Sequence, residues 1–333
     1  MLKLAVIGAG SWGTALAYRL AKNNYRIGLW VHNPNLAKII DQTHENPSYL
    51  PKVSLPANIQ ASSSLDKVLS DSQYCILVVP CQFLRGVAES LVPCLAPKTS
   101  ILTASKGIEN TTLLRPTQIL SDVIPKNLGC QTAVLSGPTF AKEVAAGLPS
   151  AAVVASEHLD TAKKFQKLLT APGFRLYVNT DVIGTEIGGA LKNVIAIAAG
   201  VSDGLGFGLN ARAALITRGL AEITRLGLSL GANPLTFQGL SGLGDLVLTC
   251  TGDLSRNRRV GLKLGKGNYT LTEIQQGMQM VAEGVPTARA AKELAAKQKI
   301  PMPITEQVYS LLFEGKNPRS AVQELMGREL TSE

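Results

Sequence analysis

A lysine inside an apolar helical segment is the sharpest chemical anomaly of the sequence. Lys192 and Asn193 interrupt a run of Gly, Ala, Val, Ile and Leu between residues 188 and 199. Gly188 and Ala196 lie one helical turn on either side of Lys192, so this helix face carries small residues and leaves room for a ligand. Burial lowers the pKa of a lysine, which can then act as a general base. The alternative is a lysine that reaches solvent at a domain edge.

The first glycines of the chain form a dinucleotide-binding fingerprint. Gly8, Gly10 and Gly13 stand in the string GAGSWG, which follows a buried strand at 4–7 and opens a helix. The first glycine allows the tight turn, the second lets backbone N–H groups approach a pyrophosphate, and the third allows close helix–strand packing. The anion would then lie at the helix N-terminus. A glycine-rich turn without a ligand is the alternative.

The second strand carries no acidic residue for a ribose 2′-hydroxyl. NAD-preferring sites usually carry Asp or Glu about 20 residues beyond the fingerprint, whereas the first acidic residue of this chain is Asp41. The strand ends at His32 and Asn33, which can accept a 2′-phosphate without charge repulsion. We therefore expect an NAD(P)H site that favours NADPH, with NADH also used.

Two strand ends in the first half carry groups suited to an anion. Lys106 and the Gly137-Pro138-Thr139 turn each close a buried strand, so both are expected in the crevice at the carboxyl ends of the strands. An ammonium there can bind a phosphate or polarise a carbonyl, and a turn that opens a helix at Ala141 offers N–H groups and a hydroxyl. A solvated loop lysine and an N-cap by Thr139 are the alternatives.

Two further segments stand in the second half. Asp245 lies in the glycine-dense string GLSGLGDLVLT, where it either caps a helix that begins at Leu246 or holds the charge of Lys192. Residues 255–259 read Ser-Arg-Asn-Arg-Arg, and arginine gives forked recognition of phosphate oxygens. A solvated basic loop and nucleic-acid binding are the alternatives, and the lack of interleaved aromatic residues counts against stacking on single strands.

The elements that must position these residues fall into two groups. Short apolar runs, predicted as strands, alternate with helical patterns as far as residue 180. The predicted strands are 4–7, 27–31, 75–79, 101–104, 133–135, 151–155 and 175–178, and the helices are 14–22, 83–95, 117–123 and 159–169. Beyond them only helices are predicted, at 186–201, 211–228, 286–299, 305–313 and 320–326. We expect an α/β protein, with a doubly wound, mostly parallel Rossmann-type domain at 1–180 and an all-α domain at 181–333.

Composition narrows the classes of function. The 333 residues are 45% hydrophobic and 17% charged, which suits two globular domains and argues against a disordered chain. Basic residues exceed acidic ones by nine in the chain and by seven in residues 1–180. No dense basic tail carries this excess, so we expect phosphorylated small molecules as ligands and no nucleic acid.

Cysteine usage and hydropathy indicate a compartment. The five cysteines are odd in number and form neither a CxxC motif nor a cluster with histidine, so we expect no disulfide framework, no metal site and a reducing compartment. No stretch of about 18 uninterrupted apolar residues occurs, and the apolar start is too short for a signal peptide. We therefore expect a cytoplasmic protein without a membrane span.

Taken in order, these segments resemble the bacterial-type NAD(P)-dependent glycerol-3-phosphate dehydrogenases. The resemblance covers nearly the whole chain and rests on the strings GAGSWGTALA, ASKG, SGPTFAKEVAAGLP, GGALKNVIAIAAG, NARAALITRGLAE, GLGDLVLTCTG and SRNRR. It implies reversible hydride transfer between dihydroxyacetone phosphate and sn-glycerol 3-phosphate, which supplies the glycerol backbone of phospholipids. A homodimer is expected by analogy.

The resemblance also implies a role for each matched residue. Lys192 would be the proton acceptor and Asp245 its charged partner, with Asn193 and Thr249 holding this polar centre. Together with Lys192 and Asp245, the substrate contacts would be Lys106, Gly137, Thr139, Ser255, Arg256 and Asn257. The nucleotide contacts would be Gly8, Gly10, Ser11, Trp12, Gly13, His32, Lys106, Ala141, Arg256, Val281 and Glu283. No metal is needed.

Two rival functions compete with this one. A β-hydroxyacid or ketopantoate-type reductase also joins a Rossmann domain to a helical one and can use a lysine, but its substrate is a carboxylate, so the phosphate-suited residues 255–257 count against it. A non-catalytic dinucleotide sensor that binds nucleic acid is the other rival. The charge distribution and the lack of a DNA-binding motif count against that sensor.

Overall fold

The chain divides into two compact units. The computed structural model describes residues 1–329. The first unit comprises residues 1–106 and 114–186, and the second comprises residues 107–113 and the described chain from Ile187 onward. The sequence places the boundary after residue 180, and the units divide at Glu186, inside helix α8 (Val182–Gly204). The loop 107–113 groups with the second unit.

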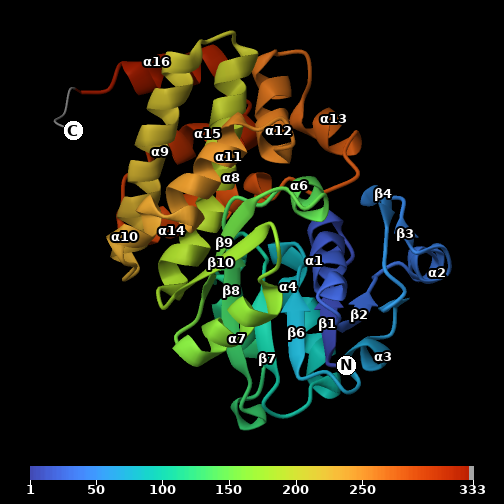
Figure 1. Cartoon of the computed structure of the whole chain (residues 1–333). Helices are drawn as coiled ribbons and strands as arrows, with labels where there is room; N and C mark the ends of the chain where they lie inside the picture. The colour runs from blue at the N-terminus through green and yellow to red at the C-terminus, as the bar shows by residue number, and fades with distance from the viewer. Residues whose placement is uncertain (330–333) are drawn as a thin grey trace. The chain divides into compact units, whose positions relative to one another are not determined.

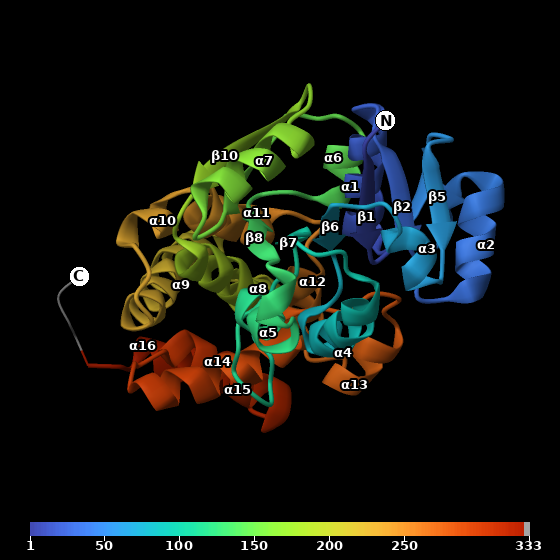
Figure 2. The same cartoon turned by 90° about the horizontal axis from the view of Figure 1, so that it is seen from below.

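An eight-stranded sheet forms the centre of the first unit (Figure 1, Figure 2). Its strands lie in the order β10-β9-β8-β7-β6-β1-β2-β5, and every neighbouring pair is parallel except β8 and β9. This confirms the predicted mostly parallel sheet. The strands are β1 (Lys3–Ile7), β2 (Arg26–Trp30), β5 (Ile59–Ser62), β6 (Tyr74–Leu77), β7 (Ser100–Thr103), β8 (Gln131–Ser136), β9 (Ser150–Ala155) and β10 (Phe174–Asn179). A separate antiparallel pair consists of β3 (Glu45–Asn46) and β4 (Leu50–Ser54).

Helices cover both faces of this sheet, because successive strand residues point to opposite sides. In β1, Leu4 and Val6 enter one apolar core, while Ala5 and Ile7 enter the other. The first core includes α1 (Ser11–Lys22), α2 (Pro34–Thr43), α6 (Ala141–Ala145) and α7 (Leu159–Leu169). The second includes α3 (Leu65–Leu69), α4 (Cys81–Leu91) and α5 (Pro116–Val123). Short 3-10 turns follow at η1 (Val92–Cys94) and η2 (Lys126–Leu128). The first unit is therefore a doubly wound α/β domain.

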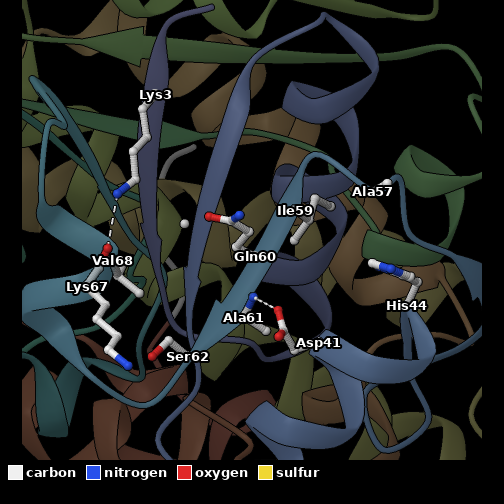
Figure 3. Close-up of a pocket in the computed structure, with 11 residues that line it drawn as sticks. Lys3, Asp41, His44, Ala57, Ile59, Gln60, Ala61, Ser62, Lys67 and Val68 are labelled. Carbon is white, nitrogen blue, oxygen red and sulfur yellow. Dashed lines mark hydrogen bonds between the residues drawn. The ribbon is translucent and has the colours of Figure 1, made fainter.

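Strand β5 forms one of the two edges of the sheet, and its outward backbone N–H groups are bound within the protein. The N–H of Ala61 donates to the Asp41 carboxylate at 3.0 Å, and the N–H of Ile59 donates to the Pro56 carbonyl at 3.0 Å. Bound N–H groups discourage another strand from pairing there. A hollow of about 420 Å³ opens beside this edge (Figure 3).

The start of α8 is fixed within the first unit. The Glu186 carboxylate pairs with Arg115 and accepts hydrogen bonds from Thr117 N at 2.7 Å and Thr117 Oγ1 at 2.8 Å. Burial raises the pKa of Glu186, and the Arg115 charge opposes that shift. Because Arg115 and Thr117 lie at the start of α5, these contacts attach the first turns of α8 to that helix.

The second unit is built from helices, and no strand occurs in it as far as residue 329, as expected from the sequence. Besides most of α8, it contains α9 (Leu209–Ser229), α10 (Pro234–Gln238), the π-helix η3 (Leu240–Gly244), α11 (Asp245–Thr251), α12 (Arg256–Gly265), α13 (Leu271–Gln276), α14 (Gly284–Gln298), α15 (Pro303–Phe313) and α16 (Pro318–Met326). Helices α10, η3, α12 and α13 were not predicted.

Helix α8 is the apolar centre of this unit. By length and composition it would pass for a membrane span, but 94% of its most apolar window is buried inside the protein, as in the core helix of a globular domain. Glycines bring α8 and α12 together. A Cβ on Gly200 would lie 2.0 Å from the Arg258 carbonyl oxygen, and one on Gly261 would lie 2.0 Å from that of Ile197. The glycines of α8 therefore serve backbone-to-backbone packing.

Candidate active site

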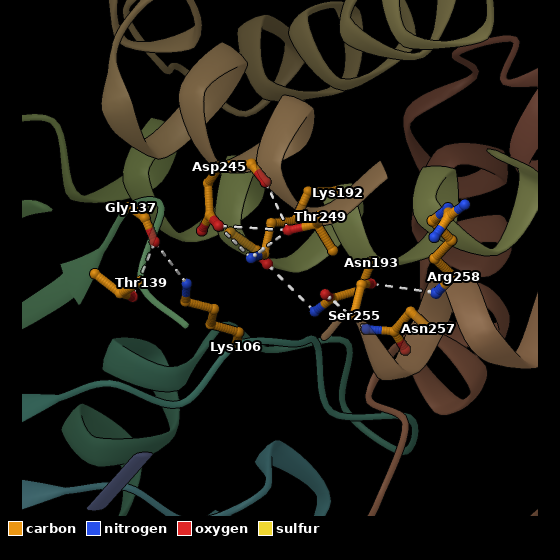
Figure 4. Close-up of polar contacts among 11 residues, drawn as sticks. Lys106, Gly137, Thr139, Lys192, Asn193, Asp245, Thr249, Ser255, Asn257 and Arg258 are labelled. Atoms are coloured by element: carbon orange, nitrogen blue, oxygen red, sulfur yellow. Dashed lines mark hydrogen bonds and ion pairs between the residues drawn. The ribbon is translucent and has the colours of Figure 1, made fainter. Parts of the chain in front are cut away.

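Lys192 lies at the centre of a buried polar cluster in the second unit. Its side chain is 8% exposed, and its ammonium forms an ion pair with Asp245, whose side chain is 1% exposed. Lys192 Nζ also donates to Thr249 Oγ1 at 2.9 Å (Figure 4). The carboxylate favours the ammonium form of the lysine, whereas burial favours the neutral amine. These opposed influences suit a group that gives and regains a proton.

The π-helix η3 ends directly before Asp245 and positions it in this cluster. A Cβ on Gly242 would lie 2.2 Å from the Phe237 carbonyl oxygen, so the close turn requires glycine there. Gly244 is the N-cap of α11 and Asp245 its first residue, so the alternative that Asp245 caps this helix is wrong. Thr249 follows one turn later and donates to the Asp245 carbonyl at 2.6 Å. The glycines of this segment therefore mark the π-helix η3 in the sequence. Single π-helical turns are often found at functional sites.

The expected free space beside Lys192 is absent at Gly188. A Cβ on Gly188 would lie 2.5 Å from the Ser241 carbonyl oxygen, so the backbone of η3 fills the position that the sequence left for a ligand. Ala196, on the other side, is fully buried. The small residues of this face accommodate protein backbone, and that part of the prediction is wrong.

A second chain of contacts begins at Asn193. Its side-chain oxygen accepts a hydrogen bond from Asn257 Nδ2 at 2.8 Å, and Asn257 Oδ1 accepts one from the Gly284 N–H at 2.9 Å. Both asparagines are buried. A Cβ on Gly284 would lie 2.6 Å from the Asn193 carbonyl oxygen, so α14 must begin with glycine. These hydrogen bonds therefore hold α8, α12 and α14 together around Asn193, the residue that follows Lys192.

Residues 255–259 begin a helix, so the alternative of a solvated basic loop is wrong. Ser255 is the N-cap of α12, and its hydroxyl accepts a hydrogen bond from the Arg258 N–H at 3.2 Å. Arg258 pairs with Asp203 and with Asp253, each at 2.8 Å. Asp203 also pairs with Arg212 at 2.6 Å. Arg258 therefore belongs to a structural ion-pair network that joins α8, α9 and α12.

Arg256 does not join this ion-pair network and instead contacts the segment before α14. Its Nη1 donates to the Val281 carbonyl oxygen at 2.9 Å. Burial lowers the pKa of the Arg256 guanidinium, and the charge of Glu283 opposes that shift. An arginine always remains charged in a protein. The three residues Arg256, Val281 and Glu283, predicted as nucleotide contacts, thus lie together at the start of α12 and before α14.

The fingerprint glycines in the first unit have the backbone that a pyrophosphate site needs. Gly8 has φ +112°, and a Cβ there would lie 2.5 Å from the Val78 carbonyl oxygen. A Cβ on Gly13 would lie 1.8 Å from the Gly8 carbonyl oxygen, whereas a Cβ on Gly10 would meet no atom within 4 Å. The first turn of α1 carries no acidic residue. Open space at the N-terminus of α1 therefore fits a dinucleotide phosphate.

Ser11, Trp12 and His32, three predicted nucleotide contacts, lie near this turn or at the end of β2. Ser11 Oγ donates to the Tyr49 carbonyl oxygen at 2.6 Å. The Trp12 ring meets Phe174 edge-on, with 6.4 Å between ring centroids. His32 is exposed at the end of β2, and its ring lies 5.7 Å from that of Trp30. The end of β2 therefore presents an exposed imidazole and no carboxylate.

Lys106, Gly137 and Thr139 form one polar group in the first unit. The Gly137 carbonyl oxygen accepts hydrogen bonds from Lys106 Nζ at 3.3 Å and from Thr139 Oγ1 at 3.1 Å (Figure 4). Gly137 has φ +138°, and a Cβ there would lie 2.8 Å from Ala152 Cα. Phe140, not Thr139, is the N-cap of α6, so the alternative of a cap by Thr139 is wrong.

The structure thus brings the predicted residues together in sets within each unit. In the first unit these are Gly8, Gly10, Ser11, Trp12 and Gly13 at the start of α1, His32 after β2, and Lys106, Gly137, Thr139 and Ala141 after β7 and β8. In the second unit they are Lys192, Asp245 and Thr249, then Asn193, Ser255 and Asn257, and then Arg256, Val281 and Glu283. Sequence reasoning missed Gly284, whose signal is a glycine directly after Glu283 at a helix start.

Comparison with known proteins identifies the family. Residues 3–162 match the model of the NAD-dependent glycerol-3-phosphate dehydrogenase N-terminus, and residues 181–323 match that of its C-terminus. The chain belongs to this family. The glycerol-3-phosphate dehydrogenase (NAD(P)+) of Geobacter metallireducens is 53% identical over 331 residues, which cover 99% of this chain and 98% of that protein. The crystal structure of glycerol-3-phosphate dehydrogenase from Coxiella burnetii is 41% identical, with TM-score 0.93, and covers 98% of this chain and 99% of that one.

The rival reductase shares the fold alone. A ketopantoate reductase structure from Ralstonia eutropha aligns with TM-score 0.59 over 98% of this chain, but with 14% identity. The family match and the identities above therefore favour the glycerol-3-phosphate dehydrogenases over this alternative.

Proposed function

We propose that this protein catalyses the reversible, NAD(P)-dependent reduction of dihydroxyacetone phosphate to sn-glycerol 3-phosphate. The observation that carries the proposal is the buried Lys192–Asp245–Thr249 cluster in a chain that matches the family along both of its halves. Residues 1–180 would bind the nucleotide, and residues 181–333 would bind the substrate and move its proton. The product would supply the glycerol backbone of phospholipids.

Lys192 would handle the proton. When the carbonyl is reduced, an alkoxide develops at its oxygen, and the Lys192 ammonium gives that oxygen a proton. In the reverse direction the neutral amine removes the proton of the hydroxyl group. Asp245 holds the lysine in place and stabilises its charged form, and Thr249 orients Nζ. Positioned proton transfer of this kind contributes about 10²–10⁴-fold to a rate.

The nucleotide would lie on the fingerprint of the first unit. Gly8, Gly10 and Gly13 would hold the pyrophosphate at the N-terminus of α1, and Ser11, Trp12, Ala141, Val281 and Glu283 would add contacts. When bound, the nicotinamide supplies or accepts the hydride. The exposed His32 and the absence of a carboxylate at the end of β2 support a preference for NADPH, with NADH also used.

The substrate phosphate would be held by the hydrogen-bond donors of the predicted substrate contacts. Arg256 and Asn257 offer a guanidinium and an amide, Ser255 offers a hydroxyl, and Lys106, Gly137 and Thr139 add an ammonium, a backbone group and a second hydroxyl. Binding of the phosphate orients the carbonyl carbon, because binding energy remote from the reacting atoms fixes their geometry.

We also propose that the protein acts in the cytoplasm as a homodimer. All five cysteines are free thiols, which supports a reducing compartment. Several large apolar side chains of the second unit are exposed, including Leu209 at 73% and Leu235 at 67%, which supports association of two copies. Light scattering during size-exclusion chromatography measures the mass directly, and a monomeric mass at micromolar concentration would contradict the dimer.

Loss or gain of NAD(P)H absorbance tests the proposed function. Purified protein is mixed with dihydroxyacetone phosphate and either NADPH or NADH, and in parallel with unphosphorylated 2-keto acids. We expect turnover with the phosphorylated ketone and a higher kcat/KM with NADPH. Turnover of the keto acids alone would instead establish the ketopantoate-type alternative.

A further inference from the structure

A second hollow lies along the outer side of α1 in the first unit. It has a volume of about 650 Å³. Helix α6 and strand β4 pack against α1, and Figure 1 shows α6 beside the end of α1. The lining of the hollow includes Tyr18 and Lys22 of α1, Lys52 of β4 and Lys142 of α6. Three cationic side chains from three separate elements therefore surround one space.

Among the described residues, acidic side chains neither line this hollow nor form ion pairs with its three lysines. No carboxylate lines the hollow, and the Lys22, Lys52 and Lys142 ammonium groups form no ion pair within residues 1–329. The nearby Glu45 carboxylate accepts a hydrogen bond from the Lys52 backbone N–H at 2.8 Å. Lys22 lies over the Tyr18 ring, with 5.7 Å between Nζ and the ring centroid. An anion in this space would relieve the repulsion among like charges.

The hollow beside the sheet edge shows the contrast. There the Lys3 ammonium donates to the Lys67 carbonyl oxygen at 3.0 Å (Figure 3). It also donates to the Ser70 carbonyl oxygen at 2.6 Å. Asp41, which lines the same hollow, accepts a hydrogen bond from the Ala61 N–H at 3.0 Å. In that edge hollow the Lys3 ammonium and the Asp41 carboxylate are bound to the protein itself, and both signs of charge are present.

The α1 hollow is separate from the proposed nucleotide site. The fingerprint lies at the N-terminus of α1, whereas Tyr18 and Lys22 lie two to three turns further along the helix. At about 1.5 Å rise per residue, the backbone of Lys22 lies about 18 Å from that of Gly10 along the axis of α1. Buried Leu55 and Ala145 form an apolar part of the lining, so the space suits a small molecule with a body as well as a charge.

From these observations we infer that the α1 hollow is an anion site for a small molecule with phosphoryl groups that carry two or more negative charges. Lys22, Lys52 and Lys142 bind the phosphoryl oxygens, and Leu55 and Ala145 contact the rest of the molecule. Lysine is a point-charge donor for phosphate and needs no fixed geometry. Because the lysines are exposed, binding weakens as ionic strength rises.

Calorimetric titration with inorganic pyrophosphate tests the inference. The full-length protein is first saturated with NADPH and sn-glycerol 3-phosphate, so that the sites of the proposed reaction are occupied. The variant Lys22→Gln/Lys52→Gln/Lys142→Gln should bind pyrophosphate about tenfold more weakly than the unaltered protein, the factor expected for three exposed ion pairs. Its turnover of dihydroxyacetone phosphate without pyrophosphate should be unchanged.

A matched control separates a site from general electrostatics. Lys163→Gln/Lys164→Gln/Lys167→Gln removes the same charge from exposed positions of α7 and should keep full pyrophosphate binding. Equal losses in both variants, no loss in the first variant, or no saturable binding to the unaltered protein would each overturn the inference. Vesicles with phosphatidylglycerol form a second arm, and lysine-dependent binding to vesicles without pyrophosphate binding would refute the small-molecule class.

Discussion

Replacing Lys192 by methionine should lower both the stability and the turnover of the protein, because the Lys192–Asp245 ion pair is lost and the proton donor is removed. The substitution keeps an unbranched side chain as far as Cε but removes the ammonium, so the Asp245 carboxylate, 1% exposed, loses its cation. Removing one partner of a buried pair costs about 3–5 kcal/mol of unfolding free energy. For a domain of about 150 residues, this lowers Tm by roughly 6–20 °C. Turnover should fall by at least about 10²-fold, because the proton donor is gone.

A double variant makes this prediction decisive. Lys192→Met/Asp245→Leu removes both charges and should recover most of the lost stability, because apolar residues of similar volume often replace a buried pair without cost. It should not recover turnover. Differential scanning calorimetry measures Tm, and NADPH oxidation with dihydroxyacetone phosphate measures rate. An active Lys192→Met enzyme would refute the role of the lysine, and a Tm equal to that of the unaltered protein would refute its pairing in the folded protein.

Three further predictions concern the nucleotide site and the stability of the second unit. Gly10→Ala should weaken NADPH binding in fluorescence titrations while leaving Tm unchanged, because the new Cβ meets no protein atom, whereas Gly13→Ala should lower Tm because its Cβ would lie 1.8 Å from a carbonyl oxygen. His32→Asp should shift the ratio of kcat/KM values toward NADH, since a carboxylate repels the 2′-phosphate, and an unchanged ratio would contradict that placement. Burial raises the pKa of Glu222 to about 6, so unfolding free energy should fall by about 2 kcal/mol in total through this group as pH rises from well below 4.5 to well above 6, and Glu222→Gln should lack that component in urea denaturation curves.

The sign of the Glu222 prediction follows from where the carboxylate lies. It accepts hydrogen bonds from Ile304 N at 2.6 Å and Thr305 N at 3.2 Å, at the start of α15, and is 1% exposed. Between its ordinary pKa and about 6, the folded state binds more protons than the unfolded state. Stability from this group is therefore present at low pH and is lost as pH rises through that interval.

The central sheet was predictable because its buried strands are apolar along their whole length. Strands β1, β6 and β7 are covered on both faces, so each appears as an apolar run with turn residues at its ends. The edge strand β5 and the short helix α3 were missed, since one is partly exposed and the other too brief to show a period. Short α10 and α13 escaped for the second reason.

The candidate site was predictable in its parts and less so in its assembly. Each segment around Lys192, Asp245 and Asn257 is unusual on its own. Their contacts join residues 53 or 64 positions apart, which local pattern cannot reveal. The small residue Gly188 was misinterpreted for the same reason, because the backbone that fills its face comes from η3.

The loop 107–113 also affects how the protein can fold as it is synthesised. It leaves the ribosome before residues 114–186, yet it groups with helices that begin at Ile187. Ile108 is fully buried in the finished protein, and most of the unit with which its loop groups is synthesised only after residue 186. A gene truncated after residue 186 would therefore yield a first unit with an unpartnered apolar loop, and the second unit expressed from Ile187 would lack one of its own segments.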